Sequence, residues 1–316
     1  MQLILGRSKR LRCAARKIVI RVRGSCPDGE HERVSRARSF RWAFFNSLLL
    51  AALILFGISS FAVASPFEDA SAAYERGDYV QALKLFRQLA ENGHQWAQRR
   101  LGLMYTEGKG VPQDYEEAVK WYRLAAAQGN VSAHYDLGLA YEKGQGVPQD
   151  YEEAAKWYRI AAAREDQWAQ ARLGLMYTEG KGVPQDYQEA VKWYRLAAAQ
   201  GYAPAEYSLG LAYEKGQGVP QDYQEAVKWY RFAAVQGNEM AQTKLGLMYA
   251  NGKGVPQDFV RAQMWLSLGA AASSGNSRDK AKENQDRVAS KMTAEQIGAA
   301  QEMARRCRES KLKNCD

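Results

Sequence analysis

After residue 64 the sequence is poor in the side chains that carry metal and redox chemistry. Histidine occurs there only at His94 and His134, and cysteine only at Cys307 and Cys315. Neither histidine has a cysteine or a carboxylate at the spacing that metal ligands use. The sequence therefore predicts no metal site and no cofactor in this part of the chain.

A nucleotide-binding loop is also missing, although one glycine-rich phrase, "GLMYTEGKGVPQDY", invites the comparison. A P-loop has the pattern G-x-x-x-x-G-K-[ST] between a strand and a helix. Here Gly102 precedes Gly108 by six residues, and Lys109 is followed by Gly110. The dinucleotide pattern G-x-G-x-x-G fails as well, because Pro112 interrupts it. These glycines need a structural explanation.

An excess of positive charge is missing from most of the chain. The whole sequence has 44 Lys and Arg against 35 Asp and Glu, a net charge of +9. Residues 1–64 hold 12 of the basic residues and 3 of the acidic ones, which leaves 32 of each in residues 65–316. The neutral remainder argues against a nucleic-acid partner.

The basic excess belongs to a leader. Residues 1–40 form a basic N-terminal extension, and Trp42 begins an apolar run without charge that ends in Ala62-Val63-Ala64. A positive region, an apolar region and a small-residue cleavage site are the plan of a secretory signal. We therefore interpret residues 41–64 as a signal peptide and expect a periplasmic or secreted protein.

Two alternatives concern this leader. Residues 42–64 approach the ~20 residues that cross a bilayer, so the segment fits an uncleaved inner-membrane anchor as well, the chain's only expected membrane contact. The basic extension is long for a signal, and a true translation start near Val34 would shorten it.

The rest of the chain is built on a 36-residue period. Glycine, proline and tryptophan each recur at this spacing: Gly102, Gly138, Gly174, Gly210 and Gly246; Pro112, Pro148, Pro184, Pro220 and Pro256; Trp121, Trp157, Trp193, Trp229 and Trp265. A second period of 72 residues shows in the alternation of "GLMY" with "GLAY". Duplication of a pair of units is its simplest account.

Each unit predicts two helices. From Asp114 to Gln128 the apolar residues follow helical spacing, with Asp114 as N-cap and Glu117 at the capping-box position. A second helix is expected over residues 131–142. The pair at Trp121 and Tyr122 recurs at one helical phase, which predicts a place in the core.

The recurring pattern A-x-x-W-Y-R-x-A-A-x-Q-G, followed by A-x-x-x-L-G-x-x-Y-x-x-G-x-G-V-x-x-D, resembles the Sel-1-like repeat family, relatives of the tetratricopeptide repeat. The resemblance extends over residues 78–272 and implies an all-α fold, a right-handed α/α superhelical solenoid of 36-residue helix–turn–helix repeats. Leu85 replaces the tryptophan of the first unit, and Glu165 replaces a closing glycine. The family resemblance implies a protein-interaction scaffold of the exported bacterial type.

The ends differ from the repeats. Residues 65–77 are predicted to form an N-terminal capping helix, and residues 273–316 are predicted to form C-terminal capping helices and a tail. Cys307 and Cys315 are predicted to form a disulfide in an oxidising compartment. Ser277-x-x-Lys280 matches the S-x-x-K of penicillin-binding enzymes, but neither S-D-N nor K-T-G accompanies it.

Two sets of residues are candidates for partner binding. At one position near the start of the second helix the units differ, which favours either specificity or packing between units: Trp96, Ser132, Trp168, Pro204 and Met240. A basic ladder recurs on the first helix: Lys84 and Arg87, Lys120 and Arg123, Lys156 and Arg159, Lys192 and Arg195, Lys228 and Arg231. The sixth unit breaks this ladder with Met264 and Ser267.

The ladder supports two interpretations. By resemblance to tetratricopeptide architectures the first helix lines the concave side, so the ladder would meet an acidic or carboxylate-bearing peptide. Alternatively it is a solvated face with i, i+4 pairs such as Glu116–Lys120. Gln188 removes that i, i+4 partner from Lys192, and the same change recurs at Lys228.

The sequence as a whole favours an extracytoplasmic scaffold that binds a protein or peptide without catalysis. The alternative is an enzyme of the repeat family that acts on cell-wall material or binds β-lactams. A hydrolase would place a clustered acid and base in the groove, whereas this sequence offers regularly repeated residues.

Overall fold

The computed structural model describes residues 65–313 and 315. The predicted extension at 1–40 and the signal or anchor at 41–64 lie outside the described residues. The described part belongs to one compact unit, Ala64–Asp316, and its regular elements are all helices. None of these helices has the length and apolar character needed to span a bilayer.

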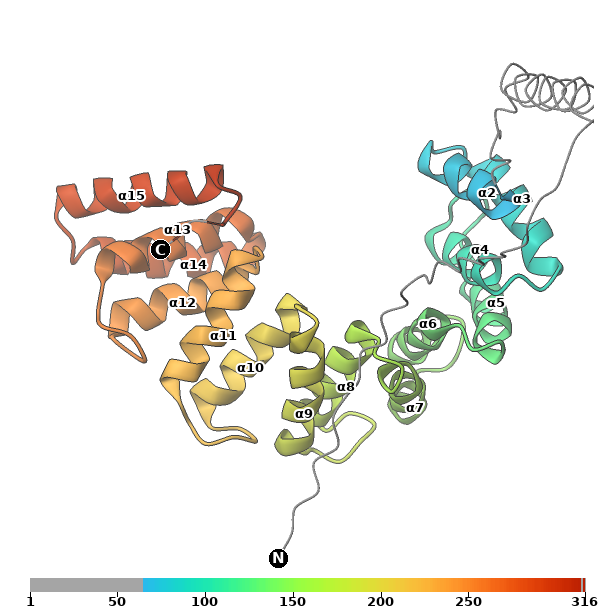
Figure 1. Cartoon of the computed structure of the whole chain (residues 1–316), viewed down its shortest axis with the longest axis horizontal. Helices are drawn as coiled ribbons and strands as arrows, with labels where there is room; N and C mark the ends of the chain where they lie inside the picture. Colours follow the sequence, from blue (N-terminus) through green and yellow to red (C-terminus); the bar gives the residue numbers. More distant parts are fainter. Residues whose placement is uncertain (1–64, 314, 316) are drawn as a thin grey trace, which may run out of the picture. The chain divides into compact units, whose positions relative to one another are not determined.

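The helices follow one another along the chain (Figure 1), and successive helices from α2 to α14 pack on each other, while α15 packs on α13. Their bounds are α2 Pro66–Glu75, α3 Tyr79–Glu91, α4 Gln95–Glu107, α5 Tyr115–Ala127, α6 Val131–Lys143, α7 Tyr151–Ala162, α8 Gln167–Glu179, α9 Tyr187–Ala199, α10 Ala203–Lys215, α11 Tyr223–Val235, α12 Glu239–Asn251, α13 Phe259–Ala272, α14 Gly275–Ala289 and α15 Ala294–Glu309. This arrangement confirms the predicted all-α solenoid.

The predicted N-cap forms, but the capping box is incomplete. The Asp114 side chain accepts a hydrogen bond from the Glu117 backbone N–H, and the other units repeat this cap. The Glu117 carboxylate binds Lys120 at 2.8 Å. The Asp cap therefore starts each of these helices, while the glutamate is used in an ion pair.

Glycine is required at two kinds of position. Gly102 lies against the Tyr122 ring, and a Cβ there would come within 2.6 Å of it, so glycine lets α4 and α5 approach closely. Gly110 has φ of 72°, and a Cβ would lie 2.4 Å from the Tyr79 carbonyl oxygen. The repeated glycines thus serve turns and close packing.

In the repeated Trp–Tyr pair, the tyrosine lies in the core and the tryptophan lies in most units at the junction between two repeats. Tyr122, Tyr158, Tyr194 and Tyr230 are buried within successive core clusters. Trp121 and its equivalents up to Trp229 are partly exposed and pack against the cluster of the preceding repeat. Trp265 is fully buried. The prediction of a core role is confirmed for the tyrosines, while most of the tryptophans bridge two repeats.

Both ends of the repeat array are covered by further helices. α2 begins with a capping box between Ser65 and Glu68 and packs on α3. At the other end α14 and α15 pack on α13. Met264, at the position where the basic ladder breaks, is fully buried. Cys307 in α15 is joined to Cys315 by a disulfide, with Cα atoms 4.6 Å apart.

Candidate binding surface

We call the exposed side chains of the even-numbered helices α4, α6, α8, α10 and α12 the even face. Trp96, Trp168 and Met240 belong to it. Ion pairs link three of the four successive pairs of these helices: Arg99 with Asp136, Arg172 with Glu142, and Lys244 with Glu214. The first of these joins α4 to α6, the second α6 to α8, and the third α10 to α12. The odd-numbered helices α3 to α11 carry the basic ladder.

The residues that vary between units lie at the start of the even-numbered helices. Trp96 is 49% exposed, Trp168 is 45% exposed and Met240 is 49% exposed. The Trp168 ring packs on Tyr135 of the preceding even-numbered helix, with ring centroids 6.3 Å apart. These side chains combine some packing between units with a large area open to solvent, and large exposed apolar side chains are typical of interaction surfaces.

The lysines of the ladder are paired in each unit from α5 to α11. The partner is the glutamate three residues earlier, at 2.8 Å for Glu117–Lys120, 2.8 Å for Glu153–Lys156, 2.7 Å for Glu189–Lys192 and 3.3 Å for Glu225–Lys228. The i, i+4 pairs of the alternative interpretation were therefore wrong, because each lysine binds the glutamate three residues earlier instead. Gln188 and Gln224 leave Lys192 and Lys228 with that partner intact.

The arginines of the ladder hold helices together. The Arg123 guanidinium donates to the Tyr141 hydroxyl at 2.9 Å, and Arg87, Arg159, Arg195 and Arg231 repeat this bond with a tyrosine eighteen residues on. The tyrosine lies on the even-numbered helix that follows. Lys228, Arg231 and Phe232 also line a hollow of about 390 Å³ against the Gly254–Val255 turn. The ladder is thus a repeated structural contact as well as a charged surface.

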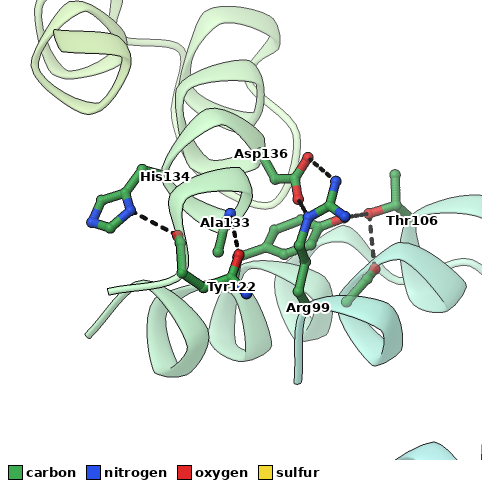
Figure 2. Close-up of polar contacts among 8 residues, drawn as sticks. Arg99, Thr106, Tyr122, Ala133, His134 and Asp136 are labelled. Carbon is green, nitrogen blue, oxygen red and sulfur yellow. Dashed lines mark hydrogen bonds and ion pairs between the residues drawn. The ribbon is translucent and has the colours of Figure 1, made fainter. Parts of the chain in front are cut away.

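A polar network fills the space beneath the even face. Figure 2 shows Arg99 and Asp136 pointing toward one another, with Nε to Oδ2 at 2.6 Å, and Tyr122 bonded to Thr106 at 2.8 Å beside them. Burial raises the pKa of Asp136, and the Arg99 charge opposes that rise. In alternate units a glutamate replaces the threonine, so Tyr158 donates to Glu142, which also accepts from Arg172. Burial is the larger cause that raises the pKa of Tyr158, and the hydrogen bond to Glu142 raises this pKa further.

The two histidines have structural contacts. His94 Nδ1 accepts from the Ala97 backbone N–H at 3.2 Å and caps α4. His134 Nδ1 lies 2.8 Å from the Asn130 carbonyl, and burial lowers the pKa of this imidazole. Over residues 65–313 and 315, no group of three or more His, Cys, Asp or Glu is placed to hold a metal ion.

Ser277 and Lys280 both line a small hollow of about 160 Å³ together with Lys244. Among the hydrogen bonds of the described residues there is none between Ser277 and Lys280.

The paired helices and their regular stacking define an α/α solenoid repeat protein. The Sel1 repeat model matches residues 71–94, 97–130, 131–166, 169–202, 203–238 and 239–274. The chain belongs to this family, whose repeats generally serve as protein-interaction scaffolds without catalysis.

Solved structures of the same family resemble the chain. A Sel1 repeat protein from Oxalobacter formigenes is 32% identical over 71% of this chain and 97% of its own, with a TM-score of 0.63. A protective antigen present in uropathogenic Escherichia coli strains, with an SLR fold, is 36% identical over 73% of this chain, with a TM-score of 0.59. The match spans about half of that antigen, 52% of its chain. No curated protein matches.

The family match also changes the phase of the repeat. The segment 131–166 contains α6 followed by α7, so an even-numbered helix comes first in each unit. In this phase the basic ladder lies on the second helix of each unit. Its predicted place on a concave side stays a prediction.

Sequence reasoning missed the charged contacts between even-numbered helices. Arg99 and Asp136 are 37 residues apart in the chain, so no spacing within one helix reveals them. Comparison of copies 72 residues apart shows the signal, because Ala171 and Ser208 stand where Arg99 and Asp136 do.

Proposed function

We propose that this protein is an exported scaffold that binds a polypeptide partner on its even face. The observation that carries the proposal is the exposure of Trp96, Trp168 and Met240, each the second residue of an alternate even-numbered helix. Aromatic side chains and methionine are enriched at interfaces. Membership of a family of interaction scaffolds supports this role.

Export is the second part of the proposal. The leader at residues 41–64 has the plan of a secretory signal. The Cys307–Cys315 disulfide fits an oxidising compartment. Fractionation of cells, with sequencing of the mature N-terminus, tests this part. A new N-terminus at Ser65 supports cleavage, an intact leader in the membrane fraction supports the anchor, and recovery in the cytoplasm contradicts export.

The binding surface is tested by capture with matched variants. The full chain is used to capture partners from the cell envelope after cross-linking, as wild type and with Trp96→Ala and Trp168→Ala. The control is Leu196→Ala, because Leu196 lies on α9 and is 50% exposed, close to the 45% of Trp168. We expect the tryptophan variants to lose captured partner while the thermal melt stays near that of the wild type. Loss of stability without loss of capture would show that the tryptophans only pack between repeats.

A further inference from the structure

Two hollows on the even face are copies of one another. The first lies between α4, α5 and α6, and the second between α8, α9 and α10. The residues that line the first recur 72 positions later in the second, and they are identical except that Ser208 replaces Asp136. The first hollow can therefore be compared directly with the second.

The second hollow is much larger than the first. Its volume is about 370 Å³, against about 100 Å³ for the first. Pro204 and Tyr207 of α10 also line it, and it extends to the start of α12, where Asn238 and Met240 join the lining. Ligand sites in proteins begin at about 300 Å³, so the second hollow reaches the size of a binding site and the first does not.

The two hollows also differ in one ion pair, whose carboxylate lines the first of them. In the first copy Arg99 reaches across from α4 to Asp136 on α6, with Nε to Oδ2 at 2.6 Å. In the second copy the same positions hold Ala171 and Ser208, which cannot form an ion pair. The Ser208 hydroxyl bonds within its own helix, to the Pro204 carbonyl at 2.9 Å. The second hollow therefore has no counterpart of the ion pair between Arg99 and Asp136.

An aromatic side chain is also exchanged at the rim. Trp168, the residue 72 positions before Met240, packs on Tyr135 with ring centroids 6.3 Å apart, and neither residue lines the first hollow. At the second hollow Met240 replaces the tryptophan, and both Met240 and Tyr207 line the open space. Methionine is flexible and adapts to irregular partner surfaces. The rim of the second hollow is thus open and adaptable.

The lining indicates the chemistry of an occupant. Leu175, Val191, Leu211 and Met240 give it an apolar wall. The Thr178 and Tyr194 hydroxyls bond to each other at 3.1 Å, so these polar groups are already satisfied. Lys215 is the charged residue of the lining, it is exposed, and no ion pair of the described residues includes it. An apolar group with a carboxylate beside it complements this site.

We propose that the hollow between α8 and α10 binds a large apolar side chain of a polypeptide partner, with a neighbouring aspartate or glutamate of that partner at Lys215. This inference rests on the proposed function and narrows it to one repeat junction. The exchange of Arg99 and Asp136 for Ala171 and Ser208 distinguishes this junction from its copy. The junction between α4 and α6 keeps its ion pair and remains structural.

The experiment closes the hollow with the chain's own ion pair. Random peptides from a displayed library are selected on the immobilised full chain, and the enriched peptides are measured against the variant with Ala171→Arg and Ser208→Asp. We expect the enriched peptides to share an aromatic or branched aliphatic residue beside an acidic one. We expect the double variant to bind them about ten-fold or more weakly, as loss of a central apolar pocket does.

A second variant does not depend on refilling the interior. Lys215→Glu changes an exposed side chain at the rim, and Lys143→Glu changes the equivalent side chain at the first hollow. We expect Lys215→Glu to weaken the enriched peptides, most strongly at low ionic strength, and Lys143→Glu to leave them unchanged. Circular dichroism is the control that checks whether each variant keeps its helices.

Three results would overturn the proposal. Equal binding of the enriched peptides to the wild type and to both the double variant and Lys215→Glu would exclude the hollow. Enriched peptides without an apolar residue would exclude its chemistry. The third result would come from native mass spectrometry of the full chain. A small apolar acid bound to the wild type and absent from the double variant would assign the hollow to a small molecule. Loss of partner capture in Trp168→Ala alongside any of these would leave the proposed function standing.

Discussion

Arg99 Nε lies 2.6 Å from Asp136 Oδ2 and ties α4 to α6 across the even face. The Asp136 side chain is only 8% exposed, so removal of its partner leaves a buried carboxylate. We expect Arg99→Ala to lower the free energy of unfolding by about 1–3 kcal/mol near neutral pH. Chemical denaturation checks the value, and an unchanged midpoint would show that the contact contributes nothing.

The same variant has a defined pH dependence. Burial raises the pKa of Asp136 and Arg99 opposes the rise, so this pKa is higher in Arg99→Ala. A carboxyl whose pKa is higher in the folded state than in the unfolded state stabilises the fold when protonated and loses that contribution as the pH rises. The loss caused by Arg99→Ala is therefore smaller at about pH 4 than at about pH 7. In Arg99→Ala with Asp136→Ser this difference should vanish, and its persistence would point to another group.

Glu165 has φ of 65°, in the left-handed region that glycine occupies at Gly129 and Gly201 in other units. A side chain there costs about 1–2 kcal/mol. We expect Glu165→Gly to raise the melting temperature and the matched change Gly201→Glu to lower it. A Cβ at Gly201 meets nothing within 4 Å, so the control tests backbone conformation without a clash. A melting temperature lowered by Glu165→Gly would show that the Glu165 side chain matters more than its backbone.

The repeated tryptophans should differ in their cost. Trp265 is fully buried, and Trp265→Ala should destabilise by about 3–5 kcal/mol. Trp193 is partly exposed at a junction between repeats, so Trp193→Ala should cost less than Trp265→Ala. Equal losses in urea unfolding would mean that burial in the core and packing at a junction contribute equally here.

Much of this architecture could be predicted from the sequence. The 36-residue period predicts the helices of the repeats to within a residue or so, and the predicted Asp114 cap is observed. The contacts of the ladder could not be predicted, because Lys120 has acidic neighbours both three and four residues earlier, and spacing alone does not decide between Glu117 and Glu116. Contacts between even-numbered helices, such as Arg172 with Glu142, depend on the stacking of units.

The contacts of the basic ladder change the result that we expect from charge reversal of its lysines. Lys192 and Lys228 are paired with Glu189 and Glu225 on odd-numbered helices, away from the even face. We expect Lys192→Glu with Lys228→Glu to leave partner capture unchanged in a folded protein. A loss of capture that depends on salt would restore the hypothesis of an acidic partner on the ladder.

Site-specific photo-cross-linking tests the even face most directly. A benzophenone side chain is placed at Trp168 or Met240 on the even face, or at Leu196 or Phe232 on the odd-numbered helices, in the full chain in its host cell. All four positions are between 45% and 50% exposed, so they are matched for access. The account predicts polypeptide adducts from Trp168 and Met240 and none from Leu196 and Phe232. Adducts from Leu196 and Phe232 alone would contradict it.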